Sequence, residues 1–113
     1  MSSEQLIKLC AESDVKEGAP VRVELEGLPV LAIFKVGEEI FILDDECTHG
    51  KASLVNDGAT DDHKIICGWH NCEFDMHTGE TYGYPCVVGL RTYTPVIKDG
   101  AIYCNGEPRP LPE

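Results

Sequence analysis

Short apolar or alternating apolar and polar segments recur along this 113-residue chain, and alternation is the pattern of a half-buried β-strand. Val21, Val23 and Leu25 alternate with Arg22 and Glu24 and show it most clearly. Further strands are predicted over residues 5–10, 28–35, 39–43, 64–66, 90–97 and 101–105, with a turn or a single helical turn at 11–18. The pattern therefore predicts an all-β chain, in which three meandering strands lead to Cys47.

Short polar segments separate these strands. Asp99-Gly100 is the strongest hairpin signal, because Asp-Gly suits a two-residue turn, and residues 36–38 predict another hairpin. Residues 56–63 are polar and contain glycine, so they predict a loop, and residues 77–80 predict a turn. Antiparallel sheets are therefore expected.

Length and cysteine content narrow the class of protein. The length predicts one domain, spanning residues 1–113. The first residues have neither the basic start nor the apolar run of a signal peptide, and nothing later is as long as a membrane span. Six cysteines in such a chain indicate metal binding, because a disulfide scaffold belongs to secreted proteins. A cytoplasmic protein with no membrane contact is expected.

Charge indicates the kind of partner. The formal net charge is −11, from 20 acidic and 9 basic residues. Nucleic acid and anionic membranes attract basic surfaces, so neither is an expected partner. A protein with a basic docking patch would be attracted, although the charge can equally serve solubility alone.

Two short motifs carry the chemistry, and each pairs one thiol with one imidazole. They are Cys47-Thr48-His49 and Cys67-Gly68-Trp69-His70. Two sulfur and two nitrogen ligands suit zinc or an iron–sulfur centre, and do not suit calcium or magnesium. Finger-type zinc folds usually draw two Cys from one element and two His from another, whereas both motifs here are mixed. A 2Fe-2S centre with Cys on one iron and His on the other would need this mixed order.

These motifs resemble those of Rieske-type ferredoxins, in particular the ferredoxin components of bacterial multicomponent aromatic-ring-hydroxylating dioxygenases. The resemblance rests on Cys47-Thr48-His49-Gly50, Leu54, Cys67-x-x-His70, Phe74, Thr78-Gly79 and Tyr82-Gly83-Tyr84-Pro85. It implies the Rieske iron–sulfur fold, with antiparallel sheets and a cluster-binding part over about residues 44–86. Two loops, each carrying one of the Cys–His motifs and called knuckles below, would form this part. One Rieske-type 2Fe-2S cluster is implied, with Cys47 and Cys67 on the inner iron and His49 and His70 on the outer iron.

The resemblance also implies a function. The chain would be an electron carrier and not an enzyme. It would pass one electron from a flavin-containing ferredoxin reductase to a terminal Rieske non-haem iron oxygenase in aromatic-compound degradation. A lone, strongly acidic domain is most simply a monomer, so a monomer is expected. Leu54, Trp69 and Pro85 would shield the cluster. The alternatives are a zinc-stabilised protein-interaction module, or a Rieske-like subunit that serves another reductase or a monooxygenase.

This chain differs from the high-potential Rieske proteins at several positions that concern cysteine. High-potential Rieske proteins carry an extra, disulfide-forming Cys in each knuckle, and Ala52 and Trp69 occupy those positions here. That bridge is therefore not expected. Cys72 stands where high-potential relatives carry a Ser whose hydroxyl bonds to the cluster, and a thiol is a weaker donor. Cys10, Cys86 and Cys104 are expected to be small buried apolar residues.

Three acidic residues and two histidines outside the motifs are also candidates for a functional role. Asp44-Asp45-Glu46 predicts a solvated turn, or an acidic docking face beside Cys47. His63 and His77 are predicted to be solvated loop histidines. They offer an iron site of two His and a carboxylate in principle, but both lie in turns, without a rigid framework that would align them.

Overall fold

The computed structural model describes residues 6–47, 52–68, 72–82 and 88–108. Their regular secondary structure is nearly all strand, with one short 3-10 helix and one short α-helix. In chain order the elements are β1 (Ile7–Ala11), η1 (Glu12–Asp14), β2 (Val21–Val23), β3 (Leu31–Val36), β4 (Glu39–Asp44), α1 (Leu54–Asp57), β5 (Gly58–Asp61), β6 (Lys64–Cys67), β7 (Glu73–Asp75), β8 (Thr92–Tyr93), β9 (Val96–Lys98) and β10 (Ala101–Cys104). The all-β prediction is confirmed.

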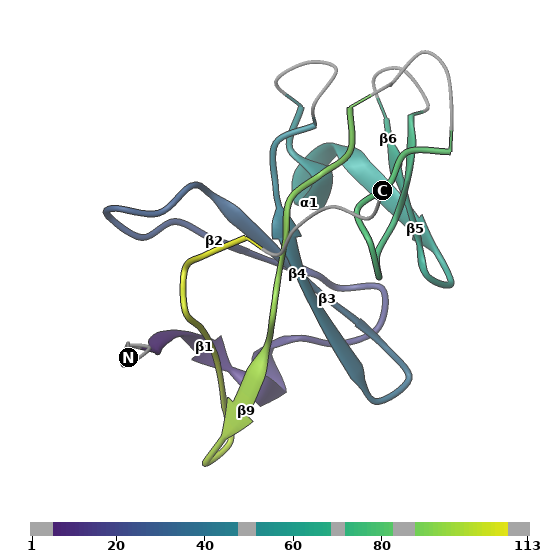
Figure 1. Cartoon of the computed structure of the whole chain (residues 1–113). Helices are drawn as coiled ribbons and strands as arrows, with labels where there is room; N and C mark the ends of the chain where they lie inside the picture. The colour runs from purple at the N-terminus through teal and green to yellow at the C-terminus, as the bar shows by residue number, and fades with distance from the viewer. Residues whose placement is uncertain (1–5, 48–51, 69–71, 83–87, 109–113) are drawn as a thin grey trace.

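Within the described residues the strands form three sheets, in which every pair is antiparallel. Their strand orders are β1-β10-β9, β2-β3-β4-β8 and β5-β6-β7. Figure 1 shows β5 and β6 at one end of the molecule, β1 and β9 at the other, and β3 and β4 between them. The β3–β4 hairpin is therefore the central element, and β4 leads from it directly to Cys47.

The central hairpin is apolar on both faces because it lies between two cores. Ala32 and Phe34 of β3 belong to the core that also contains Cys47 and Cys67. Their neighbours in β3 point the opposite way, and this second core contains Leu31, Ile33, Ile40, Ile42, Tyr93 and Ile102. Successive side chains of a strand point to opposite faces, so a strand between two cores must be apolar throughout. The continuous apolar run of β3 has this cause.

Two-residue turns connect several of the strands. Lys98 pairs with Ala101 across Asp99-Gly100, where both turn residues have positive φ (52° and 78°), as a type I′ turn requires. Val36 pairs with Glu39 across residues 37–38, where Gly37 has a positive φ of 61°. Both predicted hairpins are therefore confirmed.

Two predicted elements are wrong in part. Residues 56–63 contain the end of α1 and all of β5, and only the turn at Asp62-His63 is loop-like, because Asp61 pairs with Lys64. Residues 90–97 do not form one strand. β8 pairs with β4, whereas β9 pairs with β10 in another sheet. Pro95 lies between them and has no N–H for a sheet hydrogen bond, which accounts for the interruption.

Candidate functional site

Cys47 and Cys67 lie in one buried core although they are 20 residues apart in the sequence. Each is 1% exposed, and neither is in a disulfide. Cys47 follows β4, and Cys67 is the last residue of β6. Leu54, the first residue of α1, is buried in the same core, as the predicted shielding role requires. Two soft sulfur donors therefore belong to the same apolar core.

The two knuckle loops, residues 47–52 and 67–72, are closed by the same backbone hydrogen bond. The amide of Cys47 donates to the carbonyl of Ala52 at 3.0 Å, and the amide of Cys67 donates to the carbonyl of Cys72 at 2.7 Å. Each bond joins a cysteine to the residue five positions later, so each loop leaves and re-enters the core at nearly one point.

His49 and His70 belong to these two loops but lie outside the described residues, as do Trp69 and Pro85. The structure thus places the two predicted sulfur ligands together and gives no position for the two predicted nitrogen ligands. Their assignment stays a prediction.

The first knuckle is supported by Asp45, which is 2% exposed and therefore is not part of a solvated turn. Its carboxylate accepts hydrogen bonds from Nε of Arg22 at 3.0 Å and from the amide of Val55 at 2.9 Å. Its backbone carbonyl accepts from the amide of Leu54 at 2.7 Å. The prediction of a solvated turn was therefore wrong at this residue. A buried carboxylate needs partners, and its partner Arg22 is 23 positions away in the sequence, beyond the reach of a local pattern.

A short helix, which the sequence analysis missed, lies between the knuckles. Helix α1 has only four residues, too few for a periodic pattern. Its one sequence signal is Ser53, whose hydroxyl accepts from the amide of Asn56 at 3.1 Å, while the amide of Ser53 donates to Asp57 at 3.0 Å. These reciprocal bonds satisfy the N-terminal amides, as an N-cap does.

The second knuckle touches the end of α1 at Gly68. A Cβ atom at this position would lie 2.0 Å from the carbonyl oxygen of Asp57, closer than any real contact. Gly58 is similarly close to the carbonyl of Leu54. The second knuckle can therefore pack on α1 only because residue 68 has no side chain.

Cys72, at the end of the second knuckle, is buried and disulfide-bonded. The interpretation of this residue as a thiol was therefore wrong. The predicted burial of Cys104 is confirmed, and Cys10 is half-buried. Cys86 lies outside the described residues.

His63 and His77 come together, contrary to the prediction that no framework aligns them. Their rings stack with centroids 4.7 Å apart and an angle of 30° between the planes, and Glu39 is the adjacent carboxylate. They lie at the Lys64 end of β6, whereas Cys67 lies at its other end. At about 3.3 Å per residue, this histidine pair is roughly 13 Å along the strand from Cys67.

The donor set fits an iron–sulfur centre. Both described sulfur donors are buried, outside disulfides, and on equivalent closed loops, and thiolate sulfur is the ligand that iron–sulfur clusters take. The part of the chain that the structure describes has no helix long and apolar enough to cross a membrane.

Comparison with known proteins agrees with this chemistry. A family model described as the Rieske [2Fe-2S] domain matches residues 5–94. The ferredoxin component of the p-cumate 2,3-dioxygenase system of Pseudomonas putida is 40% identical over 106 residues, which cover 94% of this chain and 90% of that protein.

Solved structures of ferredoxins are also similar to this chain. The Sphingomonas yanoikuyae B1 ferredoxin has a TM-score of 0.85 and 39% identity, over 92% of this chain and 100% of that one. A chain in the complex of reduced oxygenase and oxidised ferredoxin of carbazole 1,9a-dioxygenase has a TM-score of 0.85 and 36% identity, over 95% of this chain and 98% of that one. The chain therefore belongs to the Rieske [2Fe-2S] domain family and is a ferredoxin with one Rieske-type 2Fe-2S cluster.

Proposed function

We propose that this ferredoxin carries one electron at a time from a flavin-containing ferredoxin reductase to a terminal Rieske non-haem iron oxygenase that acts on an aromatic compound. The observation that supports it most directly is the pair of buried cysteines on equivalent closed loops, in a chain 40% identical to a ferredoxin component of a dioxygenase system. The reductase, the oxygenase partner of this chain and the aromatic substrate are parts of the proposal.

The proposed ligands are Cys47 and Cys67 on the inner iron and His49 and His70 on the outer iron. When bound, the cluster accepts and releases one electron without breaking bonds in the protein. The described residues would hold and insulate it: the two cysteines anchor it in the apolar core, and Leu54 excludes water from that side. Burial of this kind is one of the factors that set a reduction potential, which we expect at about −150 mV.

The net charge of −11 supports a transient encounter with basic docking surfaces on both partners. A carrier must leave each partner quickly, so attraction over a distance suits it better than a tight interface. We further propose that residues 1–113 act as one Rieske domain, with the cluster-binding part at about 44–86, and that the carrier is a cytoplasmic monomer. A sedimentation experiment on the loaded protein tests the monomer.

Low-temperature EPR of the purified protein, before and after dithionite, tests the cluster and the electron-carrying function together. We expect a silent oxidised sample, a rhombic signal of low average g after reduction, and equal amounts of iron and sulfide. A colourless protein with one zinc ion and no signal would contradict the proposal, and would favour a zinc-stabilised interaction module.

The ligand assignment is tested separately with His70→Cys. A thiolate adds negative charge to the centre, so we expect a 2Fe-2S signal at a much lower potential in whatever fraction assembles. An unchanged potential in a fully loaded variant would remove His70 from the ligand set. The same measurement on His49→Cys tests the other imidazole.

The acceptor is tested by oxygen uptake in a mixture of this ferredoxin with the reductase and oxygenase components of an aromatic dioxygenase system, such as that for p-cumate. We expect uptake that depends on both the substrate and this chain, and that slows as salt is added because docking is electrostatic. Uptake that is independent of the ferredoxin concentration would contradict the proposed acceptor.

A further inference from the structure

Glu39, His63 and His77 form a compact group of metal-ligand side chains at the end of β6 remote from Cys67. Each comes from a different part of the fold. Glu39 begins β4, His63 lies in the turn between β5 and β6, and His77 lies in the turn after β7. Their ligand atoms all lie within 4.8 Å of one another. The group therefore joins the central sheet to the β5-β6-β7 sheet.

The two turns that carry the histidines are tied to each other and held in shape. The amide of Met76 donates to the carbonyl of His63 at 2.9 Å, so the backbones next to the two imidazoles are hydrogen-bonded. Asp75 fixes the second turn, because its carboxylate accepts from the amide of His77 at 2.7 Å. These bonds supply the framework that the sequence did not reveal.

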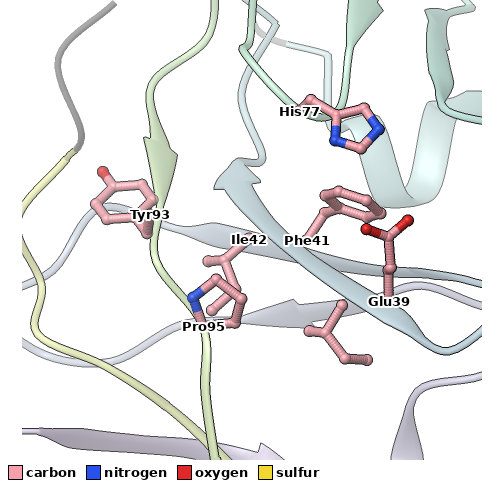
Figure 2. Close-up of a pocket in the computed structure, with 7 residues that line it drawn as sticks. Glu39, Phe41, Ile42, His77, Tyr93 and Pro95 are labelled. Atoms are coloured by element: carbon pink, nitrogen blue, oxygen red, sulfur yellow. The ribbon is translucent and has the colours of Figure 1, made fainter.

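The imidazoles are positioned by a buried aromatic ring. Phe41 contacts His63 edge to face at 5.5 Å between centroids, and His77 edge to face at 4.9 Å. Figure 2 shows the His77 ring over Phe41, with the Glu39 carboxylate beside them. Phe41 thus packs against both imidazole rings.

Distances within the group suit a small divalent ion. Nε2 of His63 lies 3.3 Å from Oε1 of Glu39. Two ligand atoms on one tetrahedral ion with bonds of about 2.0–2.1 Å are separated by roughly 3.4 Å, so this pair already has the required spacing. The wider spacing in the group, up to 4.8 Å, requires a side-chain shift of about 1.4 Å, which an exposed imidazole makes by rotation.

There is also space for water ligands beside Glu39 and His77, two of the three residues. A cavity of about 200 Å³ is lined by Glu39, Phe41 and His77, with Ile40, Ile42, Tyr93 and Pro95 on its other sides. Glu39 and His77 are exposed and His63 is half-buried, so an ion reaches the group from solvent. The site therefore has protein ligands on one side and solvent on the other.

A further carboxylate orients His63. Oδ2 of Asp62 lies 3.4 Å from Nδ1 of His63, whereas Glu39 lies next to the other ring nitrogen, Nε2. Metal-binding histidines commonly direct their second nitrogen toward a carboxylate, which fixes the tautomer and makes the other nitrogen a better ligand. Asp62 is thus a positioning residue, and Nε2 is the nitrogen left for a metal.

We propose that Glu39, His63 and His77 bind one divalent transition-metal ion, with Zn²⁺ as the best match, at a site separate from the 2Fe-2S cluster. Two imidazoles and one carboxylate are borderline and hard ligands, which suit zinc and its neighbours and do not suit calcium or magnesium. Three protein ligands leave at least one coordination position to water. A bound ion would connect the β3–β4 hairpin to the turns of the β5-β6-β7 sheet and would stabilise their packing.

Calorimetric titration of the cluster-loaded protein with Zn²⁺ tests the proposal, with cluster absorbance and iron content followed throughout. We expect one equivalent of zinc to bind without loss of iron. Glu39→Gln, His63→Gln and His77→Gln should each weaken binding at least tenfold. Glu38→Gln, a neighbouring exposed carboxylate outside the group, is the matched control and should bind within twofold of the original protein.

Two further measurements separate this site from indirect effects. Asp62→Asn should weaken zinc binding by about 10- to 100-fold, while the unfolding temperature without zinc stays unchanged. Zinc should raise the unfolding temperature of the original protein and of Glu38→Gln, and should not raise that of a His63→Gln, His77→Gln double variant. Undiminished binding by the double variant, release of iron in proportion to the zinc bound, or no binding at millimolar zinc would each overturn the proposal.

Discussion

Nε of Arg22 lies 3.0 Å from Oδ2 of Asp45, and this ion pair connects β2 to the residue two positions before Cys47. Asp45 is buried, whereas the Arg22 side chain is 37% exposed and also reaches Glu24. The aspartate therefore holds the start of the first knuckle from inside the protein, and the arginine neutralises it from the surface. Three hydrogen bonds from Arg22, Val55 and Leu54 converge on this one residue.

Asp45→Asn is expected to destabilise the first knuckle. It preserves the shape of the side chain, but it removes the charge that Arg22 and the amide of Val55 both use. Loss of charge-assisted hydrogen bonds in a buried site costs about 2 kcal/mol. Thermal unfolding and the rate of cluster bleaching should both show the loss, and Asp14→Asn, at an exposed residue in η1, should show neither. Equal stability of the two variants would contradict the structural role of Asp45.

Gly68→Ala is expected to lower cluster content. The new Cβ would meet the carbonyl oxygen of Asp57 at 2.0 Å, so the second knuckle must move away from α1. Gly27→Ala is the control: its φ of 87° makes alanine unfavourable, but no atom lies within 4 Å of the added carbon. Iron per chain should fall for Gly68→Ala and remain normal for Gly27→Ala. Full iron loading of Gly68→Ala would refute the contact.

Much of the fold followed from short-range patterns. Alternation identified β2, and Asp-Gly identified the β9–β10 hairpin, because both signals depend only on neighbours in the chain. Asp45 could not be interpreted this way, since its burial depends on Arg22, 23 residues distant. The interruption at Pro95 had a local signal, the missing N–H, but the apolar residues around it favoured one continuous strand.

In the candidate site, too, local signals were readable from the sequence and contacts between distant residues were not. The sequence order of Cys47, His49, Cys67 and His70 indicated the cluster before any fold was known, because ligand type and spacing are local properties. The grouping of Glu39, His63 and His77 depends on the start of β4 and two turns of the β5-β6-β7 sheet, which meet at Phe41. No pattern within the sequence encodes that meeting.

Cys72→Ser is expected to make the loaded protein less stable, because Cys72 is disulfide-bonded at the end of the second knuckle. Loss of a disulfide typically costs 2–4 kcal/mol, so the unfolding temperature should fall by several degrees. A phosphine reductant should lower the unfolding temperature of the original protein to a similar extent, and should leave Cys72→Ser unaffected. Cys10→Ser, which replaces a free thiol, is the control and should still respond to the reductant. A reductant response that persists in Cys72→Ser would contradict the assignment.

Stability is expected to fall above about pH 10 because of Tyr93. Burial, together with the hydrogen bond that its hydroxyl donates to Oδ1 of Asp44 at 2.8 Å, raises the pKa of Tyr93 well above its ordinary value of about 10. The folded protein therefore keeps this proton when the unfolded chain has lost it. Above the unfolded pKa the unfolded state binds fewer protons than the folded state, so the free energy of unfolding decreases as pH rises, whereas below it this group causes no change.

Tyr93→Phe tests this prediction, because phenylalanine fills the same space in the second core and cannot ionise. At pH 8 the variant should lose about 1 kcal/mol, since the hydrogen bond to Asp44 is absent. Between pH 10 and the pKa of the folded Tyr93, its free energy of unfolding should fall less steeply than that of the original protein. Urea unfolding at a series of pH values gives both quantities. Parallel pH curves for Tyr93→Phe and the original protein would show that Tyr93 ionises as easily in the folded protein as in the unfolded chain, and would contradict the buried hydrogen bond.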